Sequence, residues 1–216
     1  MTDRTTERLS ACYTGVVHDV MRAMGLKDFT LPHTLHPVTV ARTIAGPVFT
    51  VRGKVTPKAD PHETLLAWTG FLSKAKSGHV VVIAANDDEV AHMGELSGET
   101  LMRKGVPGVI ADGGCRDVEF LIEMGFSVYA RYAMPRDIVG YWMVDAMDVP
   151  VKIGKVEVVP HDYLLADRDG IIVIPRARAD EIVSAAAAAV GTENQIRTAI
   201  LGGMDPQEAY LKYGKF

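Results

Sequence analysis

The chain has 216 residues, of which 48% are hydrophobic and 23% charged, with 23 basic against 27 acidic residues and a formal net charge of −4. This composition excludes a disordered chain, because apolar residues are ample, and it gives no electrostatic reason to expect a nucleic-acid partner. The sequence has no apolar run near the ~20 residues that cross a bilayer, its first residues lack the apolar core of a signal peptide, and it has only two cysteines, Cys12 and Cys115. We therefore expect a cytoplasmic globular protein without a membrane partner.

Helical and strand patterns alternate over the first two thirds of the chain. Apolar residues at helical spacing predict a helix over 15–24, with Thr14 as its N-cap and Gly25 ending it. The β-branched run 79–84 has little polar relief, which is typical of a strand covered on both faces. The other predicted elements are strands over 47–51, 109–111 and 127–130 and helices over 63–76, 95–104 and 117–124.

The character of the chain changes after residue 149. Three short apolar runs are separated by turn residues, which predicts an antiparallel or barrel-like layer with strands over 150–153, 156–159 and 170–175. From Arg178 the chain is rich in helix formers, and Gly202-Gly203 separates a last segment over 206–213. We predict one mixed α/β domain over 1–216, with a core over about 14–178 and a helical tail over 179–216.

The densest chemical pattern runs from Gly94 to Glu119. A buried strand leads into Asp112-Gly113-Gly114-Cys115-Arg116-Asp117, where we expect a Gly-Gly turn before the next helix. The carboxyl end of a buried strand is where α/β folds place ligands. Arg116 offers a planar donor fork for the carboxylate of an oxo acid, and Asp117 offers hard oxygen ligands for Mg²⁺ or Mn²⁺. In the alternative interpretation, Asp117 is only an N-cap and Arg116 pairs with Asp112 or Glu119 at the surface.

These residues resemble the signature of the RraA-like proteins, which combines Gly94-Glu95-Leu96-Ser97 with the string from Gly105 to Asp117. The resemblance extends to an early strand at 45–51 and to a later stretch at 145–175, so that it covers roughly residues 14–178. The family includes class II 4-hydroxy-4-methyl-2-oxoglutarate / 4-carboxy-4-hydroxy-2-oxoadipate aldolases and also regulators of ribonuclease E.

The resemblance implies an α/β/β/α sandwich of the swivelling-domain type with a helical C-terminal extension, assembled as a homotrimer or homohexamer. It implies cleavage of a 4-hydroxy-2-oxo acid to pyruvate and a second oxo acid, with oxaloacetate decarboxylation as a side activity. Asp117 would bind the divalent metal, and Arg116 would contact the substrate. The backbone amides of Gly94, Glu95 and Leu96 would hold the carboxylate of the pyruvyl unit, and the Glu95 side chain would hold metal-bound water or move protons.

Two positions qualify the resemblance. His161 stands where the family usually has glycine, so the turn at that point is expected to differ. Glu193 is the candidate for the glutamate that a neighbouring subunit's C-terminal helix brings to the site in the aldolases.

The alternative function is that of a protein-binding regulator of ribonuclease E, which would act through its surface instead of a catalytic pocket.

Other polar residues have weaker claims on the chemistry. Cys115 is favoured as a small filler over a nucleophile, because the motif contains no histidine to activate it. His18 and Asp19 are lesser candidates for the border of the pocket. His92 precedes the Gly94 loop and could line the pocket, but a surface or capping role is favoured. The aromatic residues Trp68, Tyr141 and Trp142 are expected in the core or at subunit contacts. The string Asp167-Arg168-Asp169-Gly170 lacks the further oxygen positions of a calcium loop and is predicted to be a turn.

Overall fold

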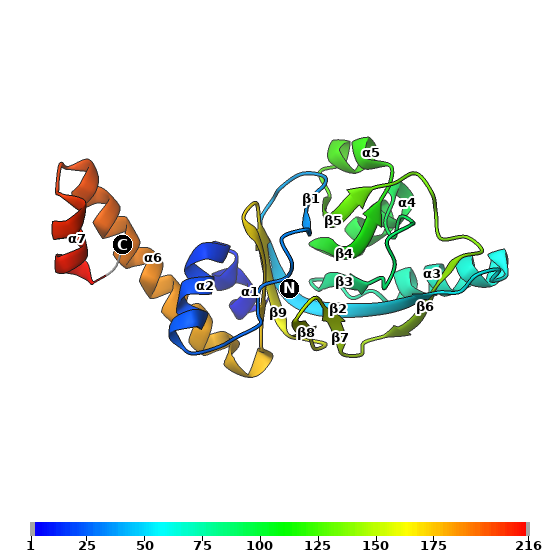
Figure 1. The fold of residues 1–216 in the computed structure, drawn as a ribbon, viewed down its shortest axis with the longest axis horizontal. Coiled ribbons are helices and arrows are strands. Elements are labelled where there is room, and N and C mark those ends of the chain that lie inside the picture. The colour runs from blue at the N-terminus through cyan, green and yellow to red at the C-terminus, as the bar shows by residue number, and fades with distance from the viewer. Residues whose placement is uncertain (1–2, 215–216) are drawn as a thin grey trace.

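A computed structural model describes residues 3–214 of the chain (Figure 1). Its centre is a mixed sheet with the strand order β1-β5-β4-β3-β2-β9-β10, to which β6 adds by pairing with β2. The strands of this sheet are β1 (His36–Pro37), β2 (Ile44–Val55), β3 (Val80–Ala84), β4 (Gly108–Cys115), β5 (Ser127–Ala133), β6 (Trp142–Met147), β9 (Tyr163–Asp167) and β10 (Gly170–Ile174). Strands β2, β3, β4 and β5 run parallel, whereas β9 and β6 pair antiparallel with the first and last parts of β2.

Three helices cover one face of the parallel strands. They are α3 (Pro61–Lys74), α4 (Glu95–Arg103) and α5 (Val118–Glu123). Their buried side chains, which include Phe71, Leu101 and Leu121, pack against Val81 and Val109 of the sheet in one apolar cluster. Because β3 is buried along its whole length, its continuous apolar run is explained by cover on both faces.

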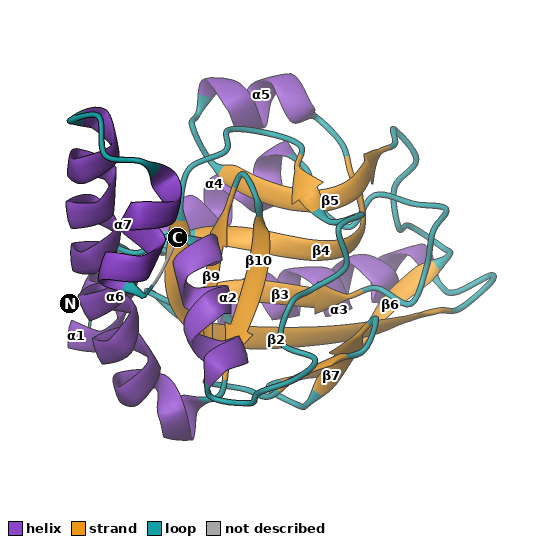
Figure 2. Cartoon of the chain, turned by 60° about the vertical axis from the view of Figure 1, so that its left-hand side comes forward, coloured by secondary structure: helices purple, strands orange, loops and turns teal. Residues whose placement is uncertain are grey.

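The opposite face of the sheet packs against a two-stranded hairpin made of β7 (Val151–Ile153) and β8 (Val156–Val158). The outer surface of β9 and β10 is covered by α1 (Arg4–Leu9), α2 (Thr14–Ala23) and the first half of α6 (Ala179–Leu201). After that half, α6 continues away from the sheet, and α7 (Pro206–Tyr213) lies beside its far end (Figures 1 and 2). No helix within residues 3–214 combines the length and the apolar character needed to cross a membrane.

The expected fold class is confirmed: the chain forms a mixed α/β fold with a helical C-terminal extension. The prediction that Thr14 is an N-cap is wrong, because Thr14 is already helical and its amide and hydroxyl both donate to the Asp167 carboxylate, at 2.8 and 2.7 Å. The turn predicted at Asp167–Gly170 joins β9 to β10, as expected. Helix α1 and strands β6 and β9 were not predicted from the sequence.

The predicted Gly113-Gly114 turn is also wrong, since both glycines lie inside β4. Gly114 pairs with Tyr132 of β5 after a shift in register. A Cβ at Gly113 would lie 2.3 Å from Nδ1 of His92, and a Cβ at Gly114 would lie 2.5 Å from the Tyr132 ring. The two glycines therefore let neighbouring side chains approach the strand closely, and the chain does not turn until after Cys115.

Candidate active site

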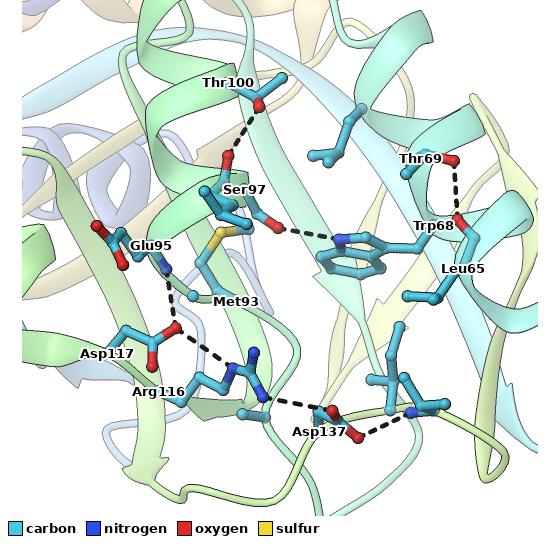
Figure 3. A pocket seen from close by; sticks show the side chains of 16 residues that line it. Leu65, Trp68, Thr69, Met93, Glu95, Ser97, Thr100, Arg116, Asp117 and Asp137 are labelled. Atoms are coloured by element: carbon cyan, nitrogen blue, oxygen red, sulfur yellow. Dashed lines mark hydrogen bonds and ion pairs between the residues drawn. The ribbon is translucent and has the colours of Figure 1, made fainter. Parts of the chain in front are cut away.

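A pocket of about 330 Å³ opens at the carboxyl ends of the parallel strands. Its walls come from α3, from the segment that leads into α4, from the residues that follow β4, and from the loop after β5 (Figure 3). This edge of a parallel sheet is where α/β folds bind ligands. The five residues predicted for the site all line this pocket, namely Gly94, Glu95, Leu96, Arg116 and Asp117.

Asp117 occupies the N-cap position of α5 but does not cap it. Its backbone is left-handed, with φ 57° and ψ 36°, and its side chain makes no hydrogen bond to the helix that it precedes. The Oδ2 atom instead accepts the backbone N–H of Glu95 at 3.2 Å and lies 3.3 Å from Nε of Arg116. Aspartate is one of the few L-residues found repeatedly in this left-handed region, because its short polar side chain can hydrogen-bond locally. This conformation turns the carboxylate into the pocket, so the alternative that Asp117 is only an N-cap is not supported.

The guanidinium of Arg116 lies between two carboxylates. Its Nη1 donates to Oδ2 of Asp137 at 3.4 Å, and its Nε faces Asp117. Among residues 3–214, no acceptor contacts Nη2, so this nitrogen is available to a substrate. The surface pairs considered for Arg116 do not form among the described residues: Asp112 pairs with Arg131 at 2.7 Å, and the partners of Arg116 are Asp117 and Asp137 and not Glu119.

Asp137 was missed by the sequence analysis. It lies in the loop after β5, and the amide of Val139 donates to its Oδ1 at 3.1 Å. No local motif marks it, because its role depends on the path by which this loop returns to the pocket.

Gly94 brings the start of α4 against the Arg116–Asp117 pair. Its φ of −161° is ordinary extended backbone, so its need for glycine is steric and not conformational. A Cβ at this position would lie 2.7 Å from Oδ2 of Asp117 and 3.1 Å from Cγ of Arg116. The two halves of the motif are therefore packed directly against each other.

The first turn of α4 offers backbone donors to an anion. The amide of Glu95 is already bound to Asp117, which differs from the expectation that it holds substrate. The amides of Leu96 and Ser97 have no acceptor among the described residues, as is usual at a helix start. They are the donors left for a carboxylate at this helix N-terminus.

The Glu95 side chain extends away from Trp68 and from the Arg116 guanidinium (Figure 3). Its expected part in proton transfer therefore stays a prediction. Across the pocket, Trp68 is buried in the core and also lines the cavity, and its Nε1 donates to Oγ of Ser97 at 2.9 Å. This bond ties α3 to the start of α4.

His92 is neither at the surface nor a cap, so that prediction is wrong. The ring is fully buried behind the pocket, with its centroid 4.7 Å from that of Trp142 and its Nε2 atom 3.4 Å from Oδ2 of Asp87. Burial lowers the pKa of His92 from 6.5 to about 4, which keeps the ring neutral at physiological pH. His92 does not line the pocket and so is not a candidate for contact with substrate.

Cys115 is fully buried at the end of β4, and burial raises the pKa of its thiol to about 12. A thiol in this state is a poor nucleophile, which supports its assignment as a small filler.

The remaining candidates lie outside this pocket. His18 and Asp19 are on α2, and Glu193 is on the part of α6 that extends away from the sheet. His161 has a left-handed φ of 70°, the region that glycine adopts easily, so the histidine keeps the backbone shape of the turn.

Within residues 3–214, no three His, Cys, Asp or Glu side chains lie close enough to form a metal site by themselves. Mg²⁺ in enzymes is often bound through one or two carboxylates together with water and substrate oxygens. The Oδ1 atom of Asp117 has no partner among the described residues, and Asp117 lines the pocket, so the donor set fits a cation of this kind.

The family model described as RraA-like, Aldolase/RraA, matches residues 14–173. The chain belongs to the RraA-like family. Among its relatives, protein DlpA of Legionella pneumophila is 25% identical over 96% of this chain but only 33% of its own length. The 4-hydroxy-4-methyl-2-oxoglutarate aldolase of Thermus thermophilus is 39% identical over 33% of this chain and 43% of its own. The matches thus span less than half the length of both relatives.

A solved RraA-like structure shares the whole fold. RraAS2 of Streptomyces coelicolor, described as an unusual member of the RNase ES inhibitor RraA protein family, has a TM-score of 0.80 at 23% identity. The likeness covers 91% of this chain and 97% of RraAS2. Because the family contains both aldolases and ribonuclease inhibitors, membership alone does not assign an activity.

Proposed function

We propose that this protein is a divalent-metal-dependent, class II aldolase that cleaves a 4-hydroxy-2-oxo acid to pyruvate and a second carbonyl compound. The observation that supports this most directly is the Arg116–Asp117 pair, which faces one pocket together with the unpaired amides at the start of α4. The name of the Thermus relative points to the same reaction class.

The divalent cation, Mg²⁺ or Mn²⁺, would be held by Asp117 and would supply Lewis-acid stabilisation of the negative charge that develops on the 2-oxo oxygen. This proposal needs no Schiff-base lysine, and no lysine is present among the residues that line the pocket.

The chain's own residues would bind and orient the oxo acid. The amides of Leu96 and Ser97 would bind its carboxylate, and Nη2 of Arg116 would donate to the oxygen on which charge accumulates. Asp117 and Asp137 would hold the guanidinium in this orientation, so that it is fixed before substrate arrives. The Glu95 carboxylate extends away from the guanidinium that would bind the substrate. It would therefore take the proton of the 4-hydroxyl group through a bridging water molecule and not directly.

Oxaloacetate decarboxylation is proposed as a side activity, since loss of CO₂ leaves the same charge on the same pyruvyl unit. We also propose a homotrimer or homohexamer, in which α6 of one subunit brings Glu193 toward the site of its neighbour. The extension of α6 beyond the sheet is compatible with such an assembly (Figure 1).

The proposal is tested by pyruvate release from oxaloacetate and from 4-hydroxy-2-oxo acids, measured with coupled lactate dehydrogenase. We expect turnover with Mg²⁺ or Mn²⁺, none after chelation, and recovery when the metal is added back. Asp117→Asn should abolish turnover, whereas Asp169→Asn, an exposed aspartate in the β9–β10 turn, should not. Absence of turnover on every oxo acid, together with tight binding to a ribonuclease E, would replace this proposal with the regulator function.

A further inference from the structure

Three of the charged residues of the pocket, Glu95, Arg116 and Asp117, lie across from Trp68 of α3 (Figure 3). Asp137 joins them through Arg116, at the start of the loop segment that contains Val139. They form a set of one guanidinium against three carboxylates. A divalent cation and the α4 amides would balance one substrate carboxylate on this side, but the pocket residues of this subunit leave no positive charge for a second, and the Glu193 proposed to come from a neighbouring subunit would add none.

The opposite wall is apolar and its polar groups are already bonded. It is built by Leu65, Trp68 and Leu72 of α3 and by Ile138 and Val139 of the loop after β5. The Thr69 hydroxyl donates to the carbonyl of Leu65 at 2.8 Å, so it is turned back onto its own helix. This wall favours hydrocarbon and offers no cation to an anion.

Nearby basic residues do not change this balance. The guanidinium of Arg136 pairs with Glu89 at 2.9 Å and stacks 4.4 Å from the centre of the Tyr141 ring. Nζ of Lys104 donates to the carbonyl of Ser73 at 2.6 Å. Neither side chain lines the pocket. A substrate carboxylate placed against the α3 wall would therefore lose water without gaining a partner.

We propose that the substrate is a monocarboxylic 4-hydroxy-2-oxo acid whose substituent at C4 is uncharged and apolar, so that the second product is an apolar aldehyde or ketone. This inference rests on the proposed function and differs from the dicarboxylic acid in the name of the Thermus relative. In the reaction the C3–C4 bond breaks, and its electron pair stays with C3, which takes up a proton to become the methyl group of pyruvate. The 4-hydroxyl group loses its proton as its oxygen becomes the carbonyl of the second product.

The experiment compares two acids that both release pyruvate. One is 4-hydroxy-2-oxohexanoate, which also gives propanal, and the other is 4-hydroxy-2-oxoglutarate, which also gives glyoxylate. We expect kcat/KM to favour the hexanoate by about tenfold or more, the scale at which apolar pockets discriminate. Metal-dependent exchange of the pyruvate methyl protons in D₂O, followed by NMR, tests the pyruvyl end of the site without involving the α3 wall.

A positive charge introduced on α3 makes the test specific. Leu65→Arg places a cation on the wall at a half-exposed helical position that should fold normally, and it should lower the preference for the hexanoate by about tenfold. Leu66→Arg adds the same charge at the next, exposed position outside the pocket and should leave the preference as it is. Equal use of both acids or preference for the glutarate, with proton exchange intact, would overturn this inference alone. Loss of proton exchange in the wild type would overturn the proposed function as well.

Discussion

A Cβ atom on Gly94 would lie 2.7 Å from Oδ2 of Asp117, so the start of α4 and the carboxylate that precedes α5 are in direct steric contact. The same carboxylate oxygen accepts the amide of Glu95. The position of Asp117 therefore depends on the residue that precedes α4 as much as on its own backbone.

Gly94→Ala should displace Asp117 and lower kcat for pyruvate release by about 10²-fold, the scale seen when one charge-stabilising group of an active site is lost. The fold should survive, because Gly94 has ordinary extended backbone. The measurement is steady-state turnover together with the thermal midpoint of unfolding. Gly191→Ala on α6, where an added Cβ meets nothing within 4 Å, should leave kcat unchanged. Wild-type kcat in Gly94→Ala would show that this contact does not position Asp117.

Arg116→Lys should lower kcat/KM by about 10²-fold, because an ammonium group cannot reach both flanking carboxylates and also present a planar donor to substrate. Arg103→Lys, an exposed position on α4 paired with Glu99, is the matched control and should behave as wild type. Full activity in Arg116→Lys would mean that the substrate does not use the planar fork.

Asp137→Asn should have a smaller effect than Arg116→Lys. It removes one of the two carboxylates that orient the guanidinium, and the Asp117 contact remains. We expect the KM for the oxo acid to rise by several-fold and kcat to fall by a smaller factor. Both constants are measured on the substrate that is used for Arg116→Lys. A loss as large as that of Arg116→Lys would indicate that Asp137 has a direct part in the chemistry.

Cys115→Ala should retain near-wild-type kcat, since the thiol is buried and its pKa is raised to about 12. The cost should appear in stability, as about 1 kcal/mol in the free energy of unfolding for the small cavity left behind. The native thiol should also resist thiol-specific reagents until the chain unfolds. If such a reagent inactivated the folded wild-type enzyme and left Cys115→Ala active, this account would be contradicted.

His92 should make the protein less stable in mild acid. Its pKa is about 4 when folded against 6.5 otherwise, so between these values the unfolded chain binds a proton that the folded chain does not. The free energy of unfolding should therefore fall as the pH falls from 6.5 toward 4, by up to about 1.4 kcal/mol per pH unit, and should gain no pH dependence from this group above pH 6.5.

Urea unfolding at pH 7 and pH 5 checks this prediction in the wild type and in His92→Phe, which keeps an aromatic ring against Trp142. The variant should lose the part of the pH dependence that His92 causes, whereas His33→Phe at an exposed position should keep it. An unchanged pH dependence in His92→Phe would place the titrating group elsewhere.

The convergence of Gly94 and Glu95 with Arg116 and Asp117 could be predicted because adjacent parallel strands deliver their carboxyl ends to one edge of a sheet. Asp137 could not be predicted, since it reaches Arg116 through an irregular loop whose path has no sequence pattern. The apolar wall was not predicted either, because the helical pattern of α3 does not tell whether an apolar residue faces the core or a cavity, and Trp68 was expected only in the core or at a subunit contact.

The two wrong predictions, the turn at Gly113-Gly114 and the N-cap at Thr14, have a common physical cause. Glycine pairs normally mark turns, but Gly113 and Gly114 are needed inside β4 because the ring of His92 and the ring of Tyr132 lie against them. Likewise Thr14 has the residue type of an N-cap, yet its partner is Asp167, which is distant in sequence. Local propensity was overridden in both places by a contact with a distant part of the chain.

The central claim is that Asp117 binds a divalent cation at the edge of the sheet. Its most direct test is Mn²⁺ binding, followed by the enhancement of water proton relaxation, in the wild type, in Asp117→Asn and in the surface control Asp169→Asn. The account predicts binding to the wild type and to Asp169→Asn with equal affinity, strengthened by pyruvate, and affinity at least about tenfold weaker in Asp117→Asn. Equal Mn²⁺ affinity in all three proteins would contradict it.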